Sequence, residues 1–140
     1  MKKITASITV VVLCFIFCGA SFAQVNTNDS SLYTRLGGKE RIAYYITEAV
    51  ANMAGDRRIN ARLAMSDMRM IQKNWDSIIC NKTGGNCTLP VFPKKFKATD
   101  IEWNAAIEDV TAALTKFKVK EKEKLELLEV IKALRKDFFN

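Results

Sequence analysis

The chain has 140 residues, 22 of them basic, 15 acidic and none histidine, which gives a formal net charge of +7. This length is enough for one domain that buries a core, and the basic excess is modest. The run from Lys118 to Lys124 alternates in sign, which is typical of a solvated helix rather than a phosphate-binding patch. We therefore expect no nucleic-acid partner. Without histidine no Ser/His/Asp set can form, so we also expect that the protein is not an enzyme.

The first 23 residues have the pattern of a secretory signal peptide. Two lysines near the start precede an apolar run from Ile8 to Cys18, and small residues follow at Ser21 and Ala23. The apolar run is shorter than the roughly 20 residues that span a bilayer, and the bulky residue before Cys18 disfavours a lipid anchor there. We predict cleavage after Ala23 and an exported protein, periplasmic or secreted, that has no membrane association after cleavage.

Two stretches with helical periodicity follow a polar lead-in. Within residues 39–53, apolar side chains recur at steps of three and four, which predicts an amphipathic helix. Ser66 and Asp67 are candidate caps for a second helix, whose apolar stripe includes Ile71 and Trp75. Both helices would present one apolar face to a shared core.

Cys80 and Cys87 bracket the sequence CNKTGGNC and are the two cysteines left once the signal peptide is removed. A zinc site needs four ligands, and no histidine can assist two cysteines. A catalytic redox pair usually reads C-x-x-C, which this spacing is not. Two thiols in an oxidising compartment most often form a disulfide, so we predict a bridge between these two residues.

The last part of the chain contains one broken segment and two helices. Pro90 and Pro93 interrupt the segment 88–98, because proline lacks a backbone donor and favours extended geometry before it. Thr99 and Glu102 form a capping-box pattern that predicts the start of a third helix, and a fourth follows near the C-terminus. No segment alternates like a strand, so residues 24–140 are predicted to form one all-α domain. The expected core includes Trp75, Ile78, Trp103, Val110, Ile131 and Leu134, and Ile101 belongs to the same stripe.

Four segments in this order resemble group I truncated haemoglobins, and together they extend across nearly all of residues 31–138. They are Ser31–Ile42 (SLYTRLGGKERI), Arg58–Leu63, Cys80–Cys87 and Thr99–Asn104. The resemblance implies a compact globin fold in which two helices stack over two and enclose haem. It also implies iron held by a proximal histidine and oxygen or a related gas bound on the opposite face.

The resemblance fails at the iron ligand. The proximal histidine should lie between Cys87 and Trp103, where this chain has a shorter segment with two prolines and no histidine. By the same resemblance, the distal pocket positions fall at Val50, Leu63, Ile71 and Trp75. Substitute iron ligands would have to come from lysines or methionines, namely Lys94, Lys95, Lys97, Met68 or Met70. Lysine must lose its proton before it can bind a metal, and methionine alone is a weak ligand.

Two hypotheses for function follow. In the first, haem is not bound, and the globin scaffold serves as a binding or structural module for an apolar small molecule or a protein partner. Val91, Phe92 and Phe96 would then fold inward over the space that the porphyrin occupies in the family. In the second, the protein binds haem and oxygen through an axial ligand other than histidine.

Overall fold

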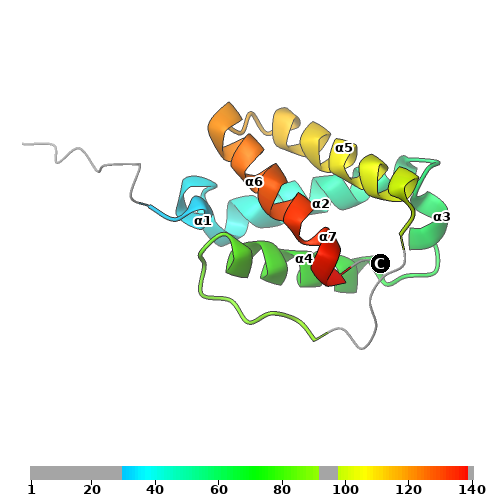
Figure 1. Cartoon of the computed structure of the whole chain (residues 1–140), viewed down its shortest axis with the longest axis horizontal. Helices are drawn as coiled ribbons and strands as arrows, with labels where there is room; N and C mark the ends of the chain where they lie inside the picture. Colours follow the sequence, from blue (N-terminus) through cyan, green and yellow to red (C-terminus); the bar gives the residue numbers. More distant parts are fainter. Residues whose placement is uncertain (1–29, 92–97, 139–140) are drawn as a thin grey trace, which may run out of the picture.

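The computed structural model describes residues 30–91 and 98–138, and all regular secondary structure in these ranges is helical (Figure 1). The predicted signal peptide lies outside the described residues. No helix in the two described ranges is long and apolar enough to cross a membrane. The helices are α1 (Leu32–Arg35), α2 (Gly38–Gly55), α3 (Asn60–Leu63), α4 (Met68–Lys82), α5 (Asp100–Lys116), α6 (Glu121–Ala133) and α7 (Arg135–Phe138).

The four long helices form two antiparallel pairs. Helix α2 packs against α4, and α5 packs against α6, while contacts between α2 and α5 join the two pairs. In Figure 1, α2 and α4 run in opposite directions, as do α5 and α6. The short helices α1 and α3 lie at the two ends of α2. This arrangement confirms the prediction of an all-α fold with two helices stacked over two.

The helix starts confirm the predicted caps. The Asp67 side chain accepts hydrogen bonds from the backbone N–H groups of Arg69 and Met70 at the start of α4. At the start of α5, the Glu102 N–H donates to Thr99 Oγ1 at 3.2 Å, and the Thr99 N–H donates to Glu102 Oε2 at 2.7 Å. These bonds satisfy backbone donors that have no partner within the helix.

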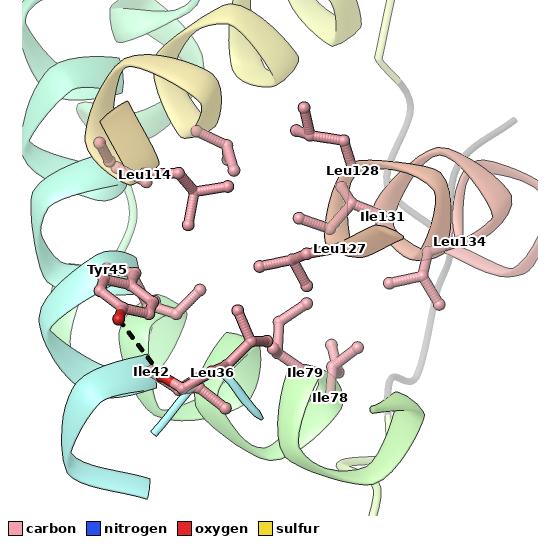
Figure 2. Close-up of a cluster of buried hydrophobic side chains, with 14 of the residues drawn as sticks. Leu36, Ile42, Tyr45, Ile78, Ile79, Leu114, Leu127, Leu128, Ile131 and Leu134 are labelled. Carbon is pink, nitrogen blue, oxygen red and sulfur yellow. Dashed lines mark hydrogen bonds between the residues drawn. The ribbon is translucent and has the colours of Figure 1, made fainter. Parts of the chain in front are cut away.

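The core lies between the two helix pairs. Leu127 and Ile131 of α6 and Ile78 and Ile79 of α4 project into the same interior (Figure 2). The hydroxyl of Tyr45 donates to the carbonyl of Leu36 at 3.2 Å, so this buried ring has a partner for its polar end. Five of the predicted core residues are buried, namely Ile78, Trp103, Val110, Ile131 and Leu134.

Trp75, which was predicted as core, and Ile101, which was placed on the apolar stripe of its helix, are not fully buried. Ile101 is 66% exposed, because residues two apart on a helix point about 200° from each other and Trp103 takes the inward position. Trp75 is only partly buried against the core, because its indole lies at the wall of a cavity described below. Helical periodicity therefore identified the inward face of each helix, but it did not show how deeply residues at the border of that face are buried.

Two glycine-containing motifs that lie far apart in the sequence pack against each other. The backbone N–H of Tyr33 donates to the carbonyl of Thr83 at 2.8 Å. A Cβ on Gly84 would lie 2.9 Å from Ser31 Cβ, and Gly84 has a φ of +93°. A Cβ on Gly85 would lie 2.9 Å from the Tyr33 ring. The chain can pass this closely only because neither glycine has a side chain.

Arg35 connects the contact between residues 31–33 and 83–85, which we call the corner, to the C-terminal half of the chain. Its guanidinium donates to the carbonyl of Ser30 at 2.8 Å, lies 3.4 Å from Glu123 Oε1 and pairs with Glu126. The Arg35 side chain is 13% exposed, and Glu123 is buried. These contacts connect α1 to α6, and the Glu126 side chain remains 44% exposed.

Cys80 and Cys87 are joined in a disulfide, as predicted. Their Cα atoms lie 5.9 Å apart, which is within the usual range for a bridge. The side-chain amide of Asn81 donates to the carbonyl of Cys87 at 2.8 Å, so the loop is also held by a hydrogen bond. The bridge fixes the chain where it leaves α4.

The segment after the disulfide is not helical where it is described. Thr88 to Val91 has no regular secondary structure, and α5 begins only at Asp100. Val91 is 94% exposed, so the expectation that it folds inward was wrong. The expected inward packing of Phe92 and Phe96 falls on residues outside the described ranges.

Loss of the disulfide is expected to lower the free energy of unfolding by about 2 kcal/mol, because the bridge closes a short loop. The double variant Cys80→Ser/Cys87→Ser should show this loss in urea denaturation, and reduction of the unaltered protein should match it. Peptide mapping after alkylation without reductant should find neither thiol labelled. Labelling of both would contradict the bridge.

The close packing at the corner predicts that a larger residue at position 85 destabilises the fold. In Gly85→Ala the new methyl would lie 2.6 Å from Cys80 Sγ and 2.9 Å from the Cys80 carbonyl oxygen, so we expect a destabilisation of about 1–3 kcal/mol. Gly55→Ala is the matched control, since no atom lies within 4 Å of its added Cβ. The control should stay within about 0.5 kcal/mol of the parent or be stabilised. Equal unfolding midpoints for both variants would contradict close packing at the corner.

Candidate functional site

A largely apolar cavity of about 140 Å³ lies between α2, α4 and α5. Each of the four long helices contributes residues to its wall, and α6 contributes Ile131. Its lining residues are Ile46, Ala49, Val50, Met53, Ile59, Arg62, Leu63, Ser66, Ile71, Asn74, Trp75, Ile78, Ala98, Glu102, Trp103, Ala106, Ile107, Val110 and Ile131. The polar members come from α3, the turn before α4, α4 itself and the start of α5.

The structure brings together all four positions that were assigned to a distal pocket. Val50, Leu63, Ile71 and Trp75 all line this cavity. Val50 lies on the buried face of α2, and Leu63 is the last residue of α3. Ile71 and Trp75 are one turn apart on α4, so their side chains share one face of that helix.

Sequence reasoning missed part of the opposite wall. Met53 lines the cavity one turn after Val50, and Ala106 and Ile107 line it from α5. Trp103 was predicted as core and is buried, but it also faces the cavity. Helical periodicity identifies these residues as inward-facing. It carries no information on where the packed side chains leave space.

Arg62 and Glu102 form a two-fold hydrogen-bonded ion pair in the cavity wall. Arg62 Nε donates to Glu102 Oε1 and Arg62 Nη2 to Glu102 Oε2, each at 2.8 Å. The Arg62 side-chain hydrogen bond, with the Thr99 backbone N–H second, lowers the pKa of Glu102 to about 2. The same pair raises the pKa of Arg62. Each charge thus has a partner of opposite sign, and the pair joins α3 to α5.

No family model matches the chain, and no curated protein matches it. Solved structures do. The chain is similar to the truncated haemoglobin of Tetrahymena pyriformis in its Fe(III) form, with a TM-score of 0.72 and 21% sequence identity. The match covers 79% of this chain and 99% of that one. The chain has the truncated-haemoglobin fold. A haemoglobin from Chloroflexus aurantiacus gives a TM-score of 0.68 at 17% identity, covering 80% of this chain and 99% of that one. The 2/2 haemoglobin of Synechococcus sp. PCC 7002, solved in the cyanomet state with covalently attached haem, gives 0.67 at 18% identity, covering 73% and 90%.

The described wall of this truncated-globin cavity does not fit haem iron. Iron in globins is held by a neutral imidazole, and the sequence contains no histidine. The charged side chains of the wall, Arg62 and Glu102, are bonded to each other. The single thioether in the wall is that of Met53. Methionine is a weak ligand on its own, so no group in the described wall replaces the missing imidazole.

The two methionines considered as substitute ligands lie elsewhere. Met70 is 60% exposed, because it belongs to the outward face of the first turn of α4. Met68 packs against the core from the start of α4 but does not line the cavity. Neither methionine therefore lines the part of the cavity wall that the structure describes. Lys94, Lys95 and Lys97 fall outside the described residues.

The lowered pKa of Glu102 predicts that the protein loses stability in acid. Its pKa is lowered from 4.5 to about 2, so the ionised pair stabilises the fold fully above pH 4.5. That contribution is lost as the pH falls through about 2. Glu102→Gln should lower the thermal midpoint at neutral pH and flatten its decline between these two pH values.

The control for this prediction is Glu129→Gln on α6. The Glu129 side chain is 73% exposed and pairs with Lys132 at 2.8 Å, and exposed pairs contribute little to stability. Its variant should keep the slope of the parent protein. If Glu102→Gln and the parent decline in parallel on acidification, the pair at α3 and α5 does not carry the effect.

Proposed function

We propose that this protein is an exported relative of group I truncated haemoglobins that has lost haem ligation. In this proposal the globin scaffold serves as a non-enzymatic binding module, and the cavity between α2, α4 and α5 is its binding site. The occupant is an apolar molecule rather than a porphyrin. The resemblance of the sequence motifs supports group I, and the leader pattern and the disulfide support export.

One observation carries the proposal. The cavity is lined by the positions at which the resemblance places the distal pocket, yet the described wall lacks a strong iron ligand. The cavity itself remains, with a largely apolar wall. Apolar burial without a directional bond to iron holds a porphyrin poorly and favours an occupant that needs no such bond.

A second candidate function rests on Met53. Its thioether lines the cavity, and methionine serves as an axial haem ligand in some proteins when a second ligand accompanies it. In that case the protein would be a haem- and oxygen-binding globin that uses a ligand other than histidine. One of the lysines at positions 94, 95 and 97 would be the second ligand.

Hemin titration separates the two functions. We expect no stoichiometric haem by pyridine hemochrome assay, and no Soret band that responds to carbon monoxide or cyanide after addition of excess hemin. A histidine-bearing truncated haemoglobin treated in parallel is the positive control. One haem per chain would overturn the proposal.

Variants then identify the ligand if haem does bind. Met53→Leu keeps the apolar volume of the side chain and removes its sulfur, so haem loss in this variant would assign the thioether. Met70→Leu is the matched control, because Met70 is 60% exposed and lies outside the cavity. Loss of haem on substituting Lys94, Lys95 or Lys97 by Leu would assign a lysine instead.

A further inference from the structure

The cavity has the size of a single aromatic ring. Its volume is about 140 Å³, and an engineered apolar cavity of about 150 Å³ in another protein stays dry and binds benzene or xenon. Size therefore favours an occupant of six to eight heavy atoms.

The part of the wall that the structure describes is mostly apolar, and its polar side chains are those of Arg62, Ser66, Asn74 and Glu102. Buried polar side-chain atoms without a partner do occur among the described residues, on Arg35, Asp76, Asp109 and Glu123. None of these four residues lines the cavity. A buried water needs two to four polar partners, so an apolar occupant would displace little or no bound water. A charged occupant would have to lose its hydration without gaining a counter-ion, since Arg62 and Glu102 already neutralise each other.

Aromatic side chains contribute to two sides of the cavity. Trp75 lines it from α4 and Trp103 from α5, between aliphatic side chains such as Ile71 and Ile107. Trp103 is 6% exposed and Trp75 is partly buried. Indole rings pack favourably against other aromatic rings in offset or edge-to-face arrangements, so the wall favours a ring over a linear alkane of equal volume.

We propose that this cavity binds a neutral, single-ring aromatic molecule. The proposal rests on the proposed function, since it names the class of apolar molecule that the module binds. The occupant is uncharged because the two charged side chains of the described wall are paired with each other, and it has one ring because of the cavity volume. Ser66 and Asn74 are the uncharged polar side chains of the described wall.

Calorimetry and NMR on the purified, haem-free protein test the inference with benzene as the probe. Saturable binding is expected with a Kd of about 1 mM or tighter. In isoleucine-methyl spectra, benzene should shift the methyl signals of cavity residues such as Ile71, Ile107 and Ile131. The methyl of Ile101, which is exposed on α5, is the internal control and should not move. Benzoate, of similar size but charged, should bind at least about tenfold more weakly.

A matched pair of variants on α5 tests the location. Ala106 lines the cavity, and Ala112 on the same helix is exposed. Ala106→Leu places three further carbons in the cavity and should weaken benzene binding about tenfold or more, whereas Ala112→Leu should keep the parent affinity. If Ala106→Leu does not fold, the pattern of methyl shifts in the unaltered protein decides.

The outcomes separate the inference from the proposed function. A folded, haem-free protein that shows no saturable benzene binding would overturn the inference and leave the loss of haem ligation standing. Benzoate binding as tight as benzene, or unchanged benzene affinity in Ala106→Leu, would also overturn it. One haem per chain in the hemochrome assay would instead overturn the proposed function.

Discussion

The hydrogen bond from the Tyr33 N–H to the Thr83 carbonyl, at 2.8 Å, draws the start of the domain onto the end of α4. This close approach requires glycine at positions 84 and 85, because a Cβ at either would come within 3 Å of neighbouring atoms. The same turn directs the chain so that Cys87 meets Cys80. Two motifs about fifty residues apart are thus one structural unit. Their likeness to truncated haemoglobins is explained by this close packing of the backbone.

The corner lies at one end of the molecule, and the polar part of the cavity wall that includes Arg62, Ser66 and Glu102 lies at the other. In Figure 1, α1 and the end of α4 are at one end, and α3 with the starts of α4 and α5 is at the other. Changes in the cavity wall therefore need not disturb the corner that fixes the helices. This separation explains how a chain without histidine can keep the truncated-globin architecture. Trp103, buried at 6% exposure, and the partly buried Trp75 supply apolar contacts beside the cavity.

The fold was largely predictable, because its signals are local. The capping box at Thr99, the cap at Asp67 and the disulfide each depend on a few neighbouring residues, and each was predicted from the sequence. The four proposed pocket positions could be brought together only through the resemblance. The cavity itself could not be predicted, because its volume is the space left after side chains from several helices have packed. Ile101 shows the same limit, since periodicity alone could not decide which residue of the first turn of α5 faces inward.

Because its wall comes from α2, α4, α5 and α6, the cavity exists only when all four helices are in place. Any occupant must therefore bind the native state and not the unfolded chain, so occupancy and folding are thermodynamically linked. At a free concentration of 100 times its Kd, an occupant would add about 2.7 kcal/mol to the free energy of unfolding. That is a substantial share of the marginal stability of a domain this size. The thermodynamic stability of the protein would then depend on the local concentration of the occupant.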